Sequence, residues 1–210
     1  MRASAPVEQA PAAPPAHPAR QRIVAAARRR YFSEGFRGVT MDDLAEEIGM
    51  SKKTIYDHFP SKTVLLEAVL LDKFQSIEAE MERITAQSVA DFPVALRQLL
   101  ACLQQGVEEI QPPFVRDMRR ETPELFQRVE ERRAGLISRH FGKVIGEGRR
   151  QGLVRKDLPP RLIIETLLGA VRAIMNPPKM IELGLTPKAG FTGIISLILE
   201  GALTEKGRAK

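Results

Sequence analysis

From residue 20 onward, the chain is a succession of helical segments that glycine, proline and capping residues separate. Apolar side chains recur every four residues in the first segment, at Ile23, Ala27 and Tyr31, and no run alternates as a half-buried strand would. The dipeptides Asn-Gly and Asp-Gly, which are typical of hairpin turns, do not occur. The sequence therefore predicts an all-α protein.

Composition limits the class of protein and its partners. The 210 residues are 43% hydrophobic and 28% charged, which suffices for a sizeable core in one or two domains. Lys and Arg outnumber Asp and Glu by 32 to 26, an excess that suits a polyanionic partner. The one cysteine, Cys102, excludes an intramolecular disulfide, and no apolar run is long enough to span a membrane. We therefore expect a soluble, cytoplasmic protein with no membrane partner.

The chain divides into three expected regions. Residues 1–19 contain five prolines and seven alanines, a composition that predicts a disordered N-terminal tail. The tail is either an inert leader or a weak source of phosphate contacts through Arg2 and Arg20. We expect a first domain over residues 20–66 and a second over residues 67–210.

The first domain contains two short helices that only three residues separate. Thr40 and Asp43 form an acidic variant of the capping box at the start of the helix that Gly49 ends. Ser51 then caps the next helix, predicted over 52–59. Glycine supplies the left-handed backbone conformation that lets the second helix leave at a steep angle. This arrangement predicts a helix-turn-helix, although generic helical hairpins share it.

Specific residues in this region carry a family resemblance. They are the spacing Ile-x3-Ala-x3-Tyr-x3-Gly-Phe from Ile23, the runs Thr40-Met41-Asp42-Asp43-Leu44-Ala45 and Ile48-Gly49-Met50-Ser51, the run Thr54-Ile55-Tyr56-Asp57-His58-Phe59-Pro60-Ser61-Lys62, and Leu65-Leu66. A Tyr-x-His-Phe-x-x-Lys run directly after a short helix is highly specific. Residues 23–66 resemble the DNA-binding region of the tetracycline-repressor (TetR) family of bacterial transcription regulators.

The resemblance implies a sequence-specific DNA-binding regulator whose partner is double-stranded operator DNA. It assigns DNA contacts to eight side chains: Thr40, Ser51, Lys52, Lys53, Thr54, Tyr56, His58 and Lys62. Residues at the start of a recognition helix point at base edges, and Lys62 is suited to phosphate. Each residue also has a structural interpretation, since Thr40 and Ser51 cap helices and Tyr56 suits a half-buried position. The order and spacing of all eight favour the DNA-binding interpretation.

A second basic group lies in or near the first helix. Arg28, Arg29, Arg30 and Arg37 either flank the phosphate backbone of DNA or form only a solvated helix face. Arg30 departs from the family, which usually has an apolar residue at this position. Its side chain is expected at an exposed edge or with its stem lying along apolar surface.

After the long helix predicted over 62–84, four more helices are expected. They cover 92–110, 123–150, 160–175 and 187–203, each with a proline in its first turn. The last two are apolar on more than one face, so they need cover on more than one side. Burial within the monomer is one solution; the resemblance favours a homodimeric four-helix bundle. The expected interface residues are Leu162, Thr166, Ala170, Ile174, Phe191, Ile195 and Ile198.

The resemblance also implies a small-molecule effector enclosed by the helices between about 92 and 175. Its possible lining residues are Cys102, Phe114, Met118, Phe126, His140 and Phe141, although ordinary core packing explains each of them better. The protein is then a repressor that an effector of unknown identity releases from its operator. The helix over 62–84 is long enough to transmit this signal between the domains.

Enzyme signatures are absent from the sequence. It contains no phosphate-binding loop, no dinucleotide fingerprint and no Gly-x-Ser-x-Gly elbow, and the three histidines at 17, 58 and 140 lack metal-ligand spacing. We therefore expect neither an enzyme nor a metal or cofactor. The alternative function is a helical adaptor that binds another protein without DNA specificity. Salt-dependent binding to duplex DNA would separate the two.

Overall fold

The computed structural model describes residues 18–87 and 90–209 of the chain. In order, its helices are α1 (Pro18–Glu34), α2 (Met41–Ile48), α3 (Lys52–His58), α4 (Lys62–Gln87), α5 (Phe92–Glu109), α6 (Pro112–Glu121), α7 (Pro123–Arg150), α8 (Pro160–Ile174), α9 (Pro177–Glu182), α10 (Pro187–Ala202) and α11 (Glu205–Arg208). Within these residues the only β pairing is an isolated bridge between Val154 and Leu203. The all-α prediction is confirmed.

The predicted N-terminal tail lies outside the described residues except for its last two. These two, Pro18 and Ala19, belong to α1, so the prediction that the tail extends to residue 19 is wrong at its end. Proline is compatible with the first position of a helix, because no intrahelical partner awaits its missing N–H. Gly35 follows α1 with φ 86°, the left-handed conformation expected of a helix stop.

The helix-turn-helix forms as its capping residues predict. Thr40 Oγ1 accepts from the Asp43 N–H at 3.1 Å, and Asp43 Oδ2 accepts from the Thr40 N–H at 2.7 Å. Gly49 ends α2 with φ 63° and ψ 40°, and Ser51 Oγ accepts from the Thr54 N–H at 3.1 Å to begin α3. The left-handed Gly49 and the cap from Ser51 set the three-residue turn, and the reciprocal capping box fixes the start of α2.

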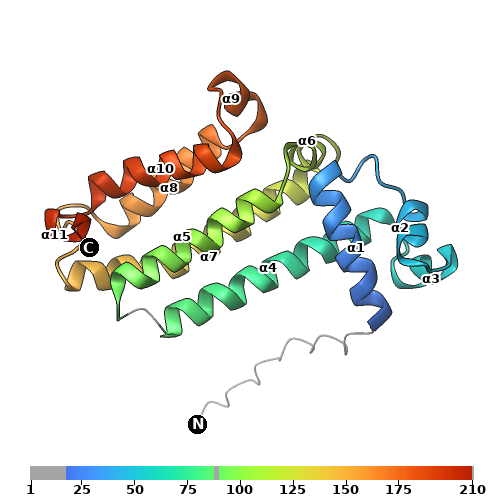
Figure 1. Cartoon of the computed structure of the whole chain (residues 1–210), viewed down its shortest axis with the longest axis horizontal. Helices are drawn as coiled ribbons and strands as arrows, with labels where there is room; N and C mark the ends of the chain where they lie inside the picture. The colour runs from blue at the N-terminus through green and yellow to red at the C-terminus, as the bar shows by residue number, and fades with distance from the viewer. Residues whose placement is uncertain (1–17, 88–89, 210) are drawn as a thin grey trace, which may run out of the picture.

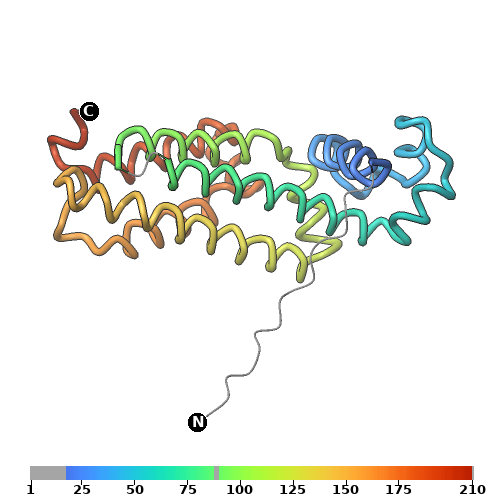
Figure 2. The backbone as a smooth tube through the Cα atoms, turned by 90° about the horizontal axis from the view of Figure 1, so that it is seen from below, coloured from blue at the N-terminus to red at the C-terminus, as the bar shows by residue number. Residues whose placement is uncertain are grey.

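The N-terminal core is shared among α1–α4 and α6. Its fully buried members include Tyr31, Leu44, Ile55 and Phe59. The expected domain boundary at residue 66 falls inside α4, where Val69 and Leu70 still pack in this core. Phe114 and Met118 of α6 complete it from the other side. In Figures 1 and 2 this unit lies at one end of an elongated molecule.

The C-terminal helices form a second core. Helices α5 and α7 lie between α4 on one side and the pair α8 and α10 on the other (Figure 1). Most buried side chains at the centre are aliphatic, and three phenylalanines, Phe74, Phe92 and Phe141, pack with them. Helix α4 runs from one unit into the other, as Figure 2 shows along its length. The two cores are thus joined by a continuous helix.

Three short helices were not predicted: α6, α9 and α11. Two of them begin with the Pro-Pro pairs at 112–113 and 177–178, which lie in the first turn of a helix, where proline is accommodated. Asn176 caps α9 by accepting from the Lys179 N–H at 3.1 Å. Thr122 precedes α7 without capping it through its side chain, and its hydroxyl donates to the Met118 carbonyl oxygen at 3.3 Å.

Candidate DNA-binding surface and ligand cavity

Helix α3 presents polar side chains at the surface. Lys53 is exposed and Tyr56 is 47% exposed, whereas Ile55 between them is completely buried. Ser51 and Thr54 satisfy each other, since their hydroxyl oxygens lie 2.8 Å apart and Ser51 also accepts from the Thr54 N–H. Lys53 and Tyr56 are therefore exposed side chains of α3, as are Lys52 and Asp57.

Two of the expected DNA-binding lysines interact with the protein itself. Lys52 pairs with Asp42 of α2, and this hydrogen bond raises the pKa of the Lys52 ammonium group. Lys62 donates from Nζ to the Arg37 carbonyl oxygen at 2.9 Å and lies 5.7 Å from the centre of the Phe36 ring. Burial lowers the pKa of Lys62. A phosphate contact by either lysine competes with these interactions.

The other two expected contacts lie at helix ends. Thr40 is exposed, but its Oγ1 is occupied by the capping box described above. His58 is half-buried in the last turn of α3, beside the completely buried Phe59. Both residues contribute to the local fold, whatever contact they make with DNA.

The arginine run of α1 has a structural role that sequence reasoning did not foresee. Arg28 donates to Glu109 of α5 at 2.6 Å and to Asp72 of α4 at 2.8 Å. Arg29 pairs with Glu47 of α2 at 2.8 Å, and Arg30 pairs with Glu34 one turn later at 2.8 Å. All three guanidinium groups thus form ion pairs within the protein, and the expectation that they flank the phosphate backbone stays a prediction.

Beside the N-terminal core, the C-terminal helices enclose a cavity of about 190 Å³. Side chains from α4, α5, α6, α7, α8, α9 and α10 line it, and most of them are apolar. Of the expected effector-binding residues, four lie on its wall: Cys102, Phe114, Met118 and Phe126. Burial raises the pKa of the Cys102 thiol, which makes this cysteine a slow nucleophile.

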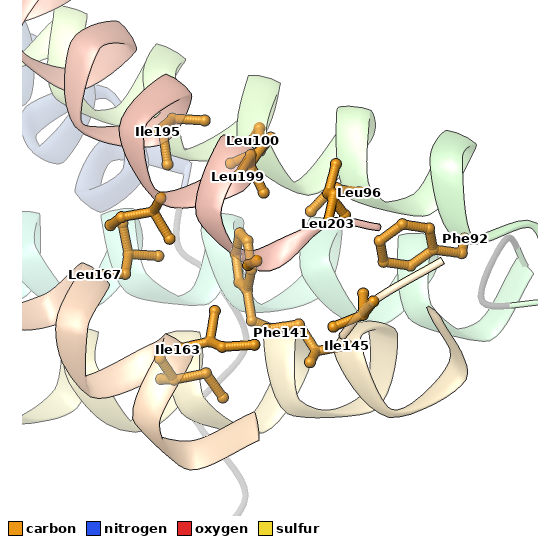
Figure 3. A pocket seen from close by; sticks show the side chains of 14 residues that line it. Phe92, Leu96, Leu100, Phe141, Ile145, Ile163, Leu167, Ile195, Leu199 and Leu203 are labelled. Atoms are coloured by element: carbon orange, nitrogen blue, oxygen red, sulfur yellow. The ribbon is translucent and has the colours of Figure 1, made fainter. Parts of the chain in front are cut away.

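The two remaining expected pocket residues lie elsewhere. Phe141 faces a separate apolar cavity of about 30 Å³, where side chains of α5, α8 and α10 surround it (Figure 3). His140 is completely buried but lines neither cavity; its Nδ1 lies 3.2 Å from Thr85 Oγ1. Consecutive residues of an α-helix point about 100° apart, so His140 and Phe141 lie on different faces of α7 and do not line the same cavity.

Five ionisable side chains on the larger cavity's wall were missed by the sequence analysis. They are Lys73, Arg119, Glu130, Arg133 and Arg172. They come from four helices and share no sequence motif. In the sequence, each is indistinguishable from a charged residue on the exposed face of a helix. Only the packing of α4, α6, α7 and α8 brings them to one cavity.

The residues expected at the dimer interface on α8 and α10 differ in their exposure. Phe191 is only 4% exposed and lines the larger cavity, while Ile195 and Ile198 line the smaller one. Phe191 therefore belongs to the core of the monomer, whereas Ile195 and Ile198 are half-buried and keep part of their surface exposed. Leu162, at 52% exposed, is on the outer face, together with the unpredicted Leu197 at 74%.

Together these features define a class of protein: an all-α chain with a helix-turn-helix at one end and a helical body that encloses an apolar cavity. Residues 23–69 match the family described as bacterial regulatory proteins, tetR family. Residues 23–69 thus form a DNA-binding domain of the TetR family, and the chain is a transcriptional regulator of TetR type.

Individual relatives agree with this assignment. The uncharacterised HTH-type transcriptional regulator YvaF of Bacillus subtilis is 22% identical, over 89% of this chain and 96% of YvaF. UidR of Escherichia coli K12 is 32% identical, but the match spans 38% of this chain and 41% of UidR. The solved SmeT–triclosan complex shares the fold, with a TM-score of 0.62 and 17% identity over 90% of this chain and 93% of SmeT. In the part of the chain that the structure describes, no helix has both the length and the apolarity to cross a membrane.

Proposed function

We propose that the protein is a homodimeric repressor that leaves its operator when a small molecule occupies the larger cavity. The observation that carries this proposal is the double role of α6. Phe114 and Met118 belong to the core of the helix-turn-helix unit and also form part of the cavity wall. A ligand in the cavity therefore touches the same side chains that hold the DNA-binding unit in place.

Helix α6 is attached to the DNA-binding unit at three points. The Gln111 N–H just before it donates to the Phe32 carbonyl oxygen at 2.9 Å, and the rings of Phe32 and Phe114 pack edge to face at 4.9 Å. Asp117 accepts from the Arg37 N–H at 3.0 Å. A displacement of α6 by a ligand would therefore be passed to α1 and to the loop that precedes α2.

A second connection runs through an ion-pair network. Lys73 lines the cavity and pairs with Glu109, which also accepts from Arg28 of α1. Burial raises the pKa of Glu109, but hydrogen bonds from Arg28 and Lys73 outweigh it and leave that pKa lowered. Helix α4, the transmitter expected from the sequence, holds Lys73 and so takes part in this route as well. The tertiary structure adds a route that the sequence did not suggest, in which α6 couples the cavity to the DNA-binding unit.

The DNA-reading surface of the proposal is α3. Its exposed Lys53 is suited to phosphate, and its exposed Tyr56 is suited to a groove contact in which the phenol ring touches a thymine methyl group. Ser51 and Thr54 hold the start of α3, Lys52 ties α3 to α2, and Lys62 ties the start of α4 to the loop after α1. A seven-residue helix reads few base pairs, so the proposal requires two copies.

The proposed dimer uses the outer face of α8 and α10. Exposed small residues on this face, Gly169, Ala173 and Gly193, permit close approach of a second pair of helices. Leu162 and Leu197 add exposed apolar area there. Two recognition helices held by such a bundle would meet successive major grooves about 34 Å apart. A ligand that prefers another geometry of the dimer would then disfavour DNA binding.

Footprinting the purified protein on DNA that flanks its own gene tests the proposal. We expect a protected site with two half-sites about one helical turn apart, and an affinity that falls as salt rises from 50 to 200 mM. A random duplex of the same length serves as the control. Equal, weak binding to both duplexes would contradict the proposal and favour the helical adaptor.

A further inference from the structure

The larger cavity carries an excess of positive charge on its wall. Lys73 is neutralised by Glu109, so the remaining ionisable groups are Arg119, Arg133 and Arg172 against a single carboxylate, Glu130. Arg119 and Arg172 are exposed to solvent, whereas Arg133 is half-buried, and burial disfavours an unbalanced charge because a low dielectric weakens the solvation of the cation. Three arginines beside one acid therefore constitute an electrostatic feature that the apolar lining does not explain.

Arg133 of α7 is the most deeply placed of these groups. Its Nη2 donates to Glu130 Oε2 at 2.7 Å, but its Nε is buried and has no hydrogen-bond partner. Burial lowers the pKa of the Arg133 guanidinium, and the nearby charges of Arg172 and Arg119 lower it further. A buried donor without an acceptor is rare in folded proteins. An anion beside Arg133 would supply that acceptor and offset the repulsion.

The two neighbouring arginines are available for the same anion. In the part of the chain that the structure describes, neither Arg119 nor Arg172 forms an ion pair with an acidic side chain. Arg119 lies over the Phe126 ring, 5.0 Å from its centre, on the cavity wall. The three arginines come from α6, α7 and α8, and each of them lines the cavity.

The rest of the wall limits the body of a ligand. Phe74, Met81, Leu103, Ile137 and Phe191 are typical of it, and they offer no hydrogen-bonding groups. An apolar cavity of about 150 Å³ in an engineered protein holds benzene, so one of about 190 Å³ accommodates a single ring with a short substituent, or a short alkyl chain. The wall is therefore suited to a ligand with an anionic group beside a compact apolar body.

We propose that the effector is a carboxylic acid with a compact apolar body. Its carboxylate would bind the guanidinium of Arg133 together with those of Arg172 and Arg119, and its body would occupy the apolar part of the cavity. Guanidinium is suited to this task because its planar N–H groups match both oxygens of a carboxylate. This inference rests on the proposed function, since it names the class of ligand that would release the protein from DNA.

Matched acids and alcohols test the inference on the full chain. The probes are 3-phenylpropanoate with 3-phenylpropan-1-ol, and octanoate with octan-1-ol, measured by isothermal titration calorimetry. We expect each acid to bind at least tenfold more tightly than its alcohol. Arg133→Met should remove this preference and leave the affinity for the alcohol unchanged. Arg128→Met, which removes an exposed arginine from the same helix, is the control and should keep the preference.

Cys102 locates the bound probe independently. It is the only cysteine of the chain and lies on the cavity wall, so an acid in the cavity should slow its reaction with a maleimide at least threefold. If Arg133→Met does not fold, Arg172→Met at an exposed position replaces it, with the same loss of preference expected. Acids that bind without protecting Cys102 would lie outside the cavity and would overturn the inference.

The outcomes separate this inference from the proposed function. Equal affinity for acid and alcohol, or a preference that survives both arginine variants, would overturn the carboxylate assignment. If no probe binds a protein that still protects its operator, the carboxylate assignment is likewise overturned, but the regulatory function stands. Loss of specific DNA binding by the wild-type protein would instead remove the proposed function itself.

Discussion

Arg28 in α1 donates from Nε to Oε1 of Glu109, 2.6 Å away at the end of α5, and so joins the DNA-binding unit to a helix that lines the larger cavity. The same carboxylate pairs with Lys73, which is almost completely buried on the cavity wall. Glu109 is therefore the shared counter-ion of one arginine in the DNA-binding unit and one lysine of the cavity.

Glu109→Gln should weaken both stability and regulation. The substitution leaves the buried Lys73 without a counter-charge, and we expect a loss of about 1–3 kcal/mol in the free energy of unfolding, measured with urea. The effector concentration needed for release from DNA should also change, because one connection between the two sites is lost. Glu108→Gln, at an exposed neighbouring position, is the control and should alter neither quantity. Unchanged regulation in Glu109→Gln would leave α6 as the sole route.

Tyr31→Phe should leave the protein as stable as the wild type or stabilise it by up to about 1 kcal/mol. The Tyr31 hydroxyl is buried without a hydrogen-bond partner, and burial raises the pKa of this phenol. Removing the hydroxyl therefore removes an unsatisfied group without opening a large cavity. Urea unfolding measures the effect. A loss of more than about 1 kcal/mol would mean that a bound water satisfies the hydroxyl.

His140 should make stability depend on pH. The Thr85 hydroxyl donates to the Met81 carbonyl oxygen, so its oxygen accepts from Nδ1–H of His140, and Nε2 stays unprotonated and without a partner. Burial, aided by the charges of Lys143 and Arg139, lowers the pKa of His140. The neutral imidazole is thus the form that the folded state tolerates.

The sign of the effect follows from that lowered pKa. Above about pH 6.5 the histidine is neutral in both states, and its contribution to stability is fully present. As pH falls below that value, the unfolded chain takes up a proton that the folded chain does not, so the free energy of unfolding decreases. His140→Gln should flatten this decrease between pH 7 and pH 5. An equally steep decrease in the variant would assign the pH dependence to other groups.

Lys53→Ala and Lys62→Ala should have different effects. Lys53 is exposed, so its loss should weaken DNA binding without affecting stability and reduce the slope of log affinity against log salt by about one. Lys62 holds the Arg37 carbonyl oxygen, so Lys62→Ala should cost about 1 kcal/mol of stability as well. Gel-shift titrations over a salt series and urea unfolding separate the two. Identical behaviour of the variants would show that the bond from Lys62 contributes nothing.

Leu197→Glu should convert the proposed dimer to a monomer. Leu197 is 74% exposed on the outer face of α10, where a charge would oppose burial against a second copy. Ile181→Glu on α9, where the native side chain is 81% exposed, is a matched control that lies away from this face. Sedimentation velocity at micromolar concentration gives the oligomeric state, and circular dichroism checks the helices. A Leu197→Glu variant that still sediments as a dimer would exclude this interface.

Local signals in the sequence predicted most helices and the whole helix-turn-helix. Thr40, Gly49 and Ser51 act on backbone groups within three or four residues, so their effect does not depend on distant parts of the chain. Proline was ambiguous for the same reason. A proline either ends the helix before it or begins the helix after it, and nearby residues alone do not decide between the two. The short helices α6 and α9, which begin at Pro-Pro pairs, were therefore not predicted.

The tertiary structure alone decided which partners the side chains have. An apolar pattern shows that Phe191, Phe141 and Leu162 belong to helices with buried faces, but it does not distinguish a monomer core, a cavity wall and an outer face. The same holds for charge: Arg28 found its acids on α4 and α5, whereas Arg133 was left with a donor unpaired beside a cavity. Contacts between helices depend on how several faces pack at once, and short-range patterns carry no information about that arrangement.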